Sequence, residues 1–146
     1  MALPITIAEA VVTELNAGSF SRGFTATRRY VPKHELDSLA DLTVTVVPKS
    51  LEITGGTRAV NQHDCEIDVA VQQRVAADAG LPDSGDADTL MDLVTEIEQA
   101  LRMKPLNDLP TAHWVRSANN PIYSVEHLEQ AMVFTSVLTF TFRVLQ

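Results

Sequence analysis

Hydrophobic and polar residues alternate almost without interruption in the segment MVFTSVLTFTFRVLQ, residues 132–146. One parity is aromatic and aliphatic and consists of Met132, Phe134, Leu138, Phe140, Phe142 and Val144. The other parity carries Val133, Thr135, Val137, Thr139, Thr141 and Arg143. Such alternation predicts a β-strand with one buried and one polar face. We call the polar positions Thr135, Thr139, Thr141 and Arg143 the threonine face.

The segment HDCEIDVAVQQRV, residues 63–75, alternates in the same way. Its apolar parity consists of Cys65, Ile67, Val69, Val71 and Val75, and a strand of this kind is typical of an antiparallel sheet. Shorter strands are expected at residues 24–31, 42–47, 51–54 and 112–117. We expect Pro32 and Pro48 to stop two of them and Gly55-Gly56 to form a turn. A short turn or helix is expected in residues 34–42, and one helical turn in residues 118–129.

Two segments have the spacing of amphipathic helices. In residues 6–16 the apolar positions are Ile7, Ala10, Val11 and Leu15, and we expect Thr6 with Glu9 to cap the start and Gly18 to end the helix. After a polar loop at residues 77–86, the second helix carries Leu90, Val94, Ile97 and Leu101 on one stripe. Asp86 or Asp88 in its first turn and Arg102 and Lys104 near its end complement the helix dipole, and Pro105 stops it.

The order of elements is helix, three or four strands, helix, two strands, without βαβ alternation. It predicts an α+β fold, a mainly antiparallel β-sheet with two amphipathic helices packed on one face. The length of 146 residues fits a single domain spanning residues 1–146. If both helices cover the apolar face of the last strand, this chain leaves the threonine face uncovered.

Composition and charge exclude several classes of protein. The net charge of −8 argues against a protein that grips the phosphate backbone of DNA, because such affinity comes from clustered Lys and Arg. The one cysteine, Cys65, rules out an internal disulfide and suits a reducing compartment. The start of the chain lacks the pattern of a signal peptide, and residues 130–142 are too short for a membrane helix. We therefore expect a soluble protein without a membrane partner.

Three carboxylates, Asp64, Glu66 and Asp68, fall on one face of the second long strand. They suggest, as an alternative function, a divalent-metal-dependent nuclease. The usual arrangement would place a lysine two residues after the last acid, where Ala70 stands, so the solvated polar face of a strand is the preferred interpretation. His34, His63, His113 and His127 are not spaced as zinc ligands, and Cys65 aligns with core residues. No catalytic arrangement, metal site or cofactor is expected.

Acidic residues concentrate between Arg74 and Arg102, where no basic residue occurs. The seven acids there are Asp78, Asp83, Asp86, Asp88, Asp92, Glu96 and Glu98. They form a solvated helix face, or an acidic wall beside passing DNA, or a partner for a basic patch on a neighbouring subunit. Residues around the first strand could supply that patch: Arg22, Arg28, Arg29 and Lys33.

The segments NNPIYSVEHLEQAMVFTSVLTFTFRVLQ, LTVTVVPKSLEI and HDCEIDVAVQQRV resemble the tail terminator, or tail completion, proteins of long-tailed bacteriophages and related prophage neck proteins. In that family a Pro-Ile-Tyr, a Glu-His-Leu and a Phe-Thr-Ser-Val-Leu strand commonly follow one another near the C-terminus. The similarity covers the chain from about Phe24 and is strongest from Pro121 to Arg143. The positions matching the motif are Pro121, Ile122, Tyr123, Glu126, His127 and residues 134–138. Pro121 to Tyr123 also have a purely structural interpretation, in which they reverse the chain before the last strand.

The resemblance implies a non-enzymatic virion subunit, assembled in the host cytoplasm, that forms a ring, usually of six copies, at the head-proximal end of the tail tube. Such a ring ends tube polymerisation, binds the tail tube protein and the head connector, and lets DNA pass without specific binding. Ring closure needs two different patches on each copy. The expected interface residues are Arg28, Arg29, Thr135, Thr139, Thr141 and Arg143, and the acidic residues of the channel or rim are Asp86, Asp88, Asp92 and Glu96. A head-side connector or stopper protein of the neck is the nearest alternative.

Overall fold

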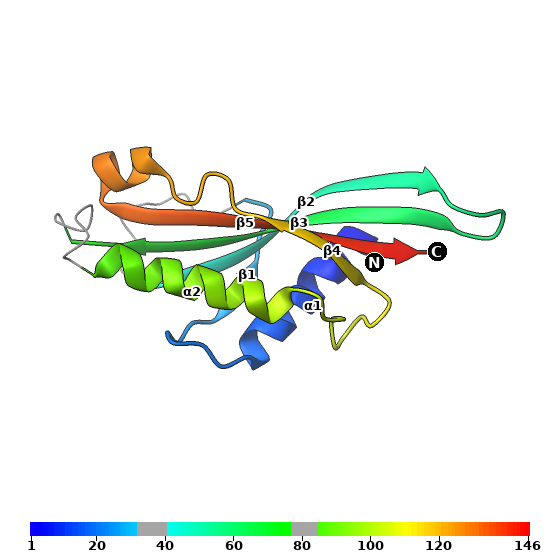
Figure 1. The fold of residues 1–146 in the computed structure, drawn as a ribbon, viewed down its shortest axis with the longest axis horizontal. Coiled ribbons are helices and arrows are strands. Elements are labelled where there is room, and N and C mark those ends of the chain that lie inside the picture. Colours follow the sequence, from blue (N-terminus) through cyan, green and yellow to red (C-terminus); the bar gives the residue numbers. More distant parts are fainter. Residues whose placement is uncertain (32–40, 77–84) are drawn as a thin grey trace.

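The structure is a computed structural model that describes residues 1–31, 41–76 and 85–146. Within these residues two α-helices, five strands and one π-helical turn follow one another (Figure 1). Their bounds are α1 Leu3–Ala17, β1 Ala26–Arg28, β2 Thr43–Gly55, β3 Asn61–Arg74, α2 Asp86–Leu101, β4 His113–Ala118, η3 His127–Ala131 and β5 Val133–Leu145.

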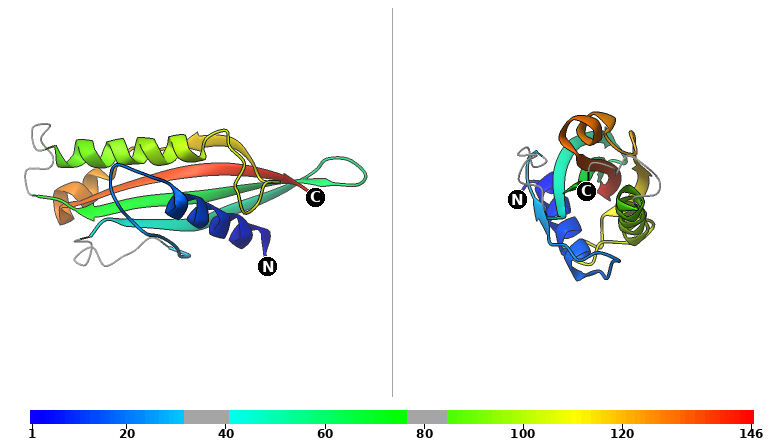
Figure 2. Two further views of the ribbon diagram at one scale, coloured as in Figure 1. Left: turned by 90° about the horizontal axis from the view of Figure 1, so that it is seen from below. Right: turned by 90° about the vertical axis from the view of Figure 1, so that its left-hand side faces the viewer.

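The five strands form one sheet in the order β1-β2-β3-β5-β4. Among the described strands, β1 runs parallel to β2, and the pairs β2–β3, β3–β5 and β4–β5 are antiparallel. Both helices lie on the same side of the sheet, α1 against β1, β2 and β3 and α2 against β5 (Figure 2). The predicted α+β class with a mainly antiparallel sheet and helices on one face is confirmed.

The core lies between the helices and the apolar parity of the two long strands. Ile67 on β3 pairs with Phe140 on β5, and both side chains are 0% exposed. Ile7 of α1 and Ile97 of α2 are also 0% exposed and belong to the same cluster. Burial of these large apolar side chains, each worth about 1.5–3 kcal/mol, holds the helices on the sheet.

Helix α1 begins earlier than the pattern predicts. It starts at Leu3, after Ala2, with Pro4 in the first turn, where a missing N–H costs no helical hydrogen bond. The predicted N-cap at Thr6 is therefore wrong, and the Thr6 hydroxyl instead donates to the Ala2 carbonyl at 3.2 Å. Gly18 follows the last helical residue as predicted, and its N–H donates to the carbonyl of Leu15.

Strand β1 is shorter than the predicted residues 24–31, and β2 is longer than predicted. Phe24 lies before β1 and packs on Phe20, with ring centroids 5.2 Å apart. Pro48 does not end β2, which continues past a bulge between Pro48 and Ser50 and absorbs the strand expected at residues 51–54. The proline is tolerated because β1 pairs with β2 only as far as Val46, so among the described residues no strand lies outside Pro48.

The outer half of the β2–β3 hairpin, residues 50–62, projects beyond the helices as an arm (Figure 1). Its turn follows Gly55-Gly56 as predicted, and the Thr57 N–H donates to the Val60 carbonyl at 2.9 Å. A Cβ on Gly56 would stand 2.9 Å from the same carbonyl oxygen, so the tight turn requires glycine there. On the arm Leu51 and Ile53 lie opposite Cys65 and His63, on the helix-facing side of the hairpin after the bulge, but they are 38% and 54% exposed.

The remaining elements follow the prediction closely. Helix α2 buries Leu90, Val94, Ile97 and Leu101, β4 matches the expected strand at residues 112–117 within one residue, and the expected helical turn forms η3. The turn or helix expected in residues 34–42 and the loop expected at residues 77–86 lie largely outside the described residues.

Candidate functional site

The threonine face lies on the side of the sheet away from the helices. Each of its positions on β5 stands opposite a polar residue of β3. The pairs are Asp64 with Arg143, Glu66 with Thr141, Asp68 with Thr139 and Gln72 with Thr135. Cross-strand neighbours of this kind are close enough for their side chains to interact directly. The acids and hydroxyls that the sequence puts on separate strands therefore form one surface.

Asp64 and Arg143 form the strongest contact of this surface. The guanidinium donates from Nε to one carboxylate oxygen at 2.8 Å and from Nη2 to the other at 3.1 Å. The hydrogen bonds from Arg143 are the main reason that the pKa of Asp64 lies below its usual value, and they raise the pKa of Arg143. This two-point geometry orients the arginine side chain along the face.

The other two acids on β3 are also engaged. The Thr139 hydroxyl donates to Asp68 at 2.6 Å. Glu66 lies between two cations, 3.6 Å from Arg116 of β4 and 3.9 Å from Lys49 of β2. The chain thus provides its own partners for the carboxylates that suggested a nuclease. Within residues 1–31, 41–76 and 85–146 the structure contains no group of three His, Cys, Asp or Glu side chains placed to hold a metal ion.

One end of the threonine face is covered by the chain itself. Thr135 is only 8% exposed because the segment around η3 packs over it, and His127 Nδ1 lies 2.9 Å from the Thr135 hydroxyl. The Gln72 amide reaches the same hydroxyl at 3.5 Å. Thr141 is 6% exposed, and Arg116 Nε donates to its hydroxyl at 3.3 Å. The expectation that this chain leaves the face uncovered is therefore wrong at Thr135 and Thr141, while Thr139 and Arg143 stay partly exposed.

The residues of the recognised C-terminal motif meet in space. Tyr123 stacks on Phe134 with ring centroids 6.5 Å apart, and the Ser124 N–H donates to the carbonyl of Thr135 at 2.9 Å. The Ser136 hydroxyl donates to the carbonyl of Ile122 at 2.7 Å. Since β4 pairs with β5 only from residue 139 onward, this segment covers the edge of β5 that β4 leaves free. These contacts favour the structural interpretation of the Pro-Ile-Tyr segment.

The acidic residues of α2 divide into two groups. Asp86, Asp88 and Asp92 are exposed. Glu96 instead accepts two hydrogen bonds from Ser21, one of them from the backbone N–H at 2.8 Å, and so fastens the loop after α1 to α2. Of the four predicted acids, Asp88 and Asp92 remain available on the surface, while Asp86 also accepts a hydrogen bond from the Ala76 N–H at 3.4 Å.

The predicted basic residues do not form one patch. Arg28 pairs with Glu9 at 2.6 Å and lies over the ring of Tyr30, with 5.3 Å between the guanidinium carbon and the ring centroid. Arg29 is exposed beside it. Arg22 donates to Gln73 at 2.9 Å at the far end of β3, and Lys33 lies outside the described residues. The basic group at the β1 edge therefore reduces to Arg28 and Arg29.

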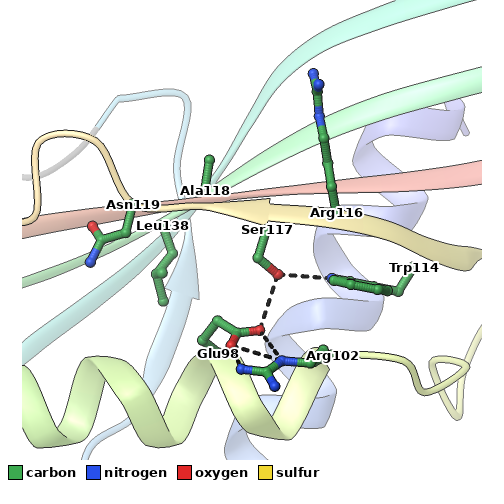
Figure 3. A pocket seen from close by; sticks show the side chains of 8 residues that line it. All are labelled: Glu98, Arg102, Trp114, Arg116, Ser117, Ala118, Asn119 and Leu138. Carbon is green, nitrogen blue, oxygen red and sulfur yellow. Dashed lines mark hydrogen bonds and ion pairs between the residues drawn. The ribbon is translucent and has the colours of Figure 1, made fainter.

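A groove between α2 and the edge strand β4 was not expected from the sequence (Figure 3). Its volume is about 420 Å³, and Trp114, Ser117 and Leu138 line it. Trp114 Nε1 donates to the Ser117 hydroxyl at 2.8 Å, which donates to Glu98 at 3.1 Å. Hydrogen bonds from Arg102 are the main cause, and Ser117 a further cause, of the lowered pKa of Glu98. The bulge between Trp114 and Arg116 puts Trp114 and Ser117 on the same, inner side of β4, and only the fold brings α2 beside them.

Cys65 is a core residue, as predicted. It is 0% exposed, and burial raises the pKa of its thiol to about 11, so the thiolate that reacts with electrophiles is scarce at neutral pH. His63 shares its side of β3, and its Nδ1 is buried without a hydrogen-bond partner among the described residues. Among residues 1–31, 41–76 and 85–146, no helix is long and apolar enough to cross a membrane.

Comparison with solved structures finds a likeness in fold. No protein-family model matches the chain, and no curated protein matches it in sequence. Among solved structures it is similar to a chain of the structure described as "Virion of native gene transfer agent (GTA) particle", with 18% sequence identity and a TM-score of 0.66. The match covers 99% of this chain and 98% of that chain. At this identity the likeness shows a common fold over the whole length.

Proposed function

We propose that this protein is a structural subunit of a phage or phage-like virion and that it terminates the tail. Several copies, six in the simplest arrangement, form a ring at the head-proximal end of the tail tube. The ring stops tube polymerisation and joins the tail to the head connector. The observation that carries the proposal is the fold likeness over nearly the full length of both chains to a component of such a particle.

The chemistry of the surface supports a binding role for the chain. On β3 the three carboxylates Asp64, Glu66 and Asp68 are engaged by Arg143, by Lys49 and Arg116, and by Thr139. A surface of paired charges and hydroxyls recognises another protein by complementarity. The net charge of −8 lets DNA pass a ring of such subunits without being held.

We assign the partly exposed section of the threonine face, Thr139 and Arg143, to contact with another virion subunit. Thr135 and Thr141 are nearly buried by the chain itself, so they are not part of this contact surface. Thr139 is held by Asp68, and Arg143 is held by Asp64. Fixed side chains lose little conformational entropy when a partner binds, which favours affinity.

The length of the tails tests this function. The gene for the protein is disabled in the parent phage, and the particles are examined by negative-stain electron microscopy. Overlong tubes without heads are expected for a terminator. Tails of normal length beside empty or leaking heads would instead assign the protein to the head side of the joint, as a connector or stopper.

Complementation with variants then tests the assigned surface. The wild-type gene should restore tails of normal length, and Thr139→Arg should not, although its product folds. Thr13→Arg is the matched control, since Thr13 is an exposed threonine on α1, on the other side of the sheet. Equal rescue by both variants would exclude the threonine face from assembly.

A further inference from the structure

The two outer edges of the sheet carry complementary chemistry. At one edge, β1 is followed by the exposed basic and aromatic residues Arg29 and Tyr30, the latter 67% exposed. At the other edge, the groove between β4 and α2 contains Trp114 and Glu98, and the outward side of α2 carries Asp88 and Asp92. In the end-on view of Figure 2, α1 and β1 lie toward the left-hand edge of the sheet and α2 lies toward the right-hand edge, with both helices on the same face.

Tyr30 is an exposed aromatic side chain that is held in place. The Arg28 guanidinium lies over its ring at 5.3 Å and is itself fastened to Glu9 at 2.6 Å. Tyr and Arg are the residues that most often dominate the energy of protein interfaces, where they fill pockets on the partner. The β1 edge therefore presents side chains of the kind that insert into a pocket on a partner.

Two acids on α2, Asp88 and Asp92, have no cation beside them in the described part of the chain. Asp88 and Asp92 are four residues apart, so they share one side of the helix, and like charges at this spacing repel each other. Glu96 and Glu98 have partners in the chain, namely Ser21 and Arg102. A basic group from outside would relieve the repulsion between the two aspartates.

We propose that the β1 edge of one copy docks on the α2–β4 side of a second copy, with Arg29 against Asp88 and Asp92 and with Tyr30 toward the groove lined by Trp114. This inference rests on the proposed ring and identifies the contact between its neighbouring subunits. A head-to-tail contact between two different patches generates rings. It also offsets the repulsion between copies that each carry a net charge of −8.

The groove fits an aromatic or aliphatic side chain from the neighbour. Trp114 and Leu138 supply apolar walls, and the Ser117 hydroxyl and Glu98 carboxylate supply polar groups at one side. Figure 3 shows Trp114 and Ser117 pointing toward α2, whereas Arg116 points to the opposite side of the strand. A tyrosine suits such a pocket because its ring is apolar and its hydroxyl forms hydrogen bonds.

A charge exchange tests the contact. Arg29→Glu and Asp92→Arg should each raise the concentration at which half of the protein is assembled by about tenfold or more, as measured by sedimentation velocity and native mass spectrometry. Mixing the two variants in equal amounts should restore assembly, since every contact between unlike copies then pairs opposite charges. The double variant should assemble like the wild type for the same reason.

Matched controls separate this contact from a general effect of charge. Arg58→Glu on the arm and Asp108→Arg in the loop after α2 make the same changes in net charge at other exposed positions and should leave assembly unchanged. Tyr30→Ala should weaken assembly, and Tyr30→Phe should weaken it less.

Three results would overturn the inference. If Arg29→Glu and Asp92→Arg assemble like their controls, or if their mixture does not assemble, the ring has another contact. If the wild-type chain remains monomeric up to the highest attainable concentration, these edges do not associate by themselves. The last result leaves the tail-length experiment to decide the proposed function separately.

Discussion

The two faces of strands β3 and β5 are built from alternate residues of the same segments, yet they serve different ends. On the helix side, Phe140 and Phe142 are 0% exposed and lie among residues of both helices. On the other side, Thr139 and Arg143 remain partly exposed, and their side chains bind Asp68 and Asp64 of the neighbouring strand. The comparison separates residues that hold the fold from residues that remain available to a partner.

The difference follows from the free energy of each kind of contact. A buried aromatic side chain loses both its transfer free energy and its packing when it is truncated, because the surrounding core does not collapse completely. A hydrogen bond at the surface replaces bonds that both groups would otherwise make to water, so its net contribution to the free energy of unfolding is small. Substitutions on the two faces should therefore differ first in stability and then in assembly.

The largest expected effect is that of Phe140→Ala. The side chain is 0% exposed and packs against Phe142, with ring centroids 6.3 Å apart. We expect the free energy of unfolding to fall by about 3–5 kcal/mol, measured by urea denaturation of the isolated chain. A loss below about 1 kcal/mol would mean that the other parity of β5 faces the core.

Asp64→Asn should have a smaller effect that depends on pH. Because Arg143 lowers the pKa of Asp64 in the folded state, the carboxylate stabilises the fold at pH values above its pKa in the unfolded chain, about 3.9. That stabilisation disappears as the pH falls through the lowered pKa. The wild type should thus be more stable than Asp64→Asn at pH 7, and the difference should shrink below about pH 4.

The control for this pH dependence is Asp108→Asn, which makes the same change at an exposed position in the loop after α2. Denaturation at pH 7 and pH 3 should give nearly equal stabilities for this variant and the wild type. A difference between wild type and Asp64→Asn that grew toward low pH would contradict the paired state of Asp64.

Thr139→Arg should have a still smaller effect on stability. The substitution removes one hydrogen bond, but the new guanidinium stands beside Asp68 and the position is partly exposed. We expect the free energy of unfolding to change by less than about 1 kcal/mol, measured by denaturation monitored with circular dichroism. If Thr139→Arg unfolded the chain while Phe140→Ala did not, the assignment of the two faces would be reversed.

The smallest effect is expected at the arm. Ile53 lies on the same face of β2 as the core residues Val44 and Val46, because the bulge after Pro48 shifts the alternation by one residue. It is nevertheless 54% exposed, since the hairpin has passed beyond the helices. Ile53→Ser should therefore change stability by no more than about 0.5 kcal/mol, whereas Val46→Ser in the body of the same strand should cost several times more. Equal losses would show that the arm is buried in solution.

Several predictions from the sequence are wrong for the same reason: the outcome depends on which residues lie nearby in space, and these are distant along the chain. Pro48 was expected to end a strand, but it is tolerated because it lies just past the last residue that pairs with β1. Thr135 was expected to be uncovered, but it is covered by η3, a segment whose weak periodicity indicates only a turn. Arg22 and Arg28 are close in sequence, yet they bind at different parts of the fold, to Gln73 and to Glu9.

The sequence by itself determined the α+β class, the helix of residues 86–101, and which parity of β3 and β5 is buried, because these depend on repeats of 2.0 and 3.6 residues that are local properties of the chain. Strand order, the parallel pairing of β1, the groove beside Trp114 and the pairing of Asp64 with Arg143 were decided only by the tertiary structure. These features join segments far apart along the chain. They depend on which buried surfaces fit together, and no local pattern of residues encodes that choice.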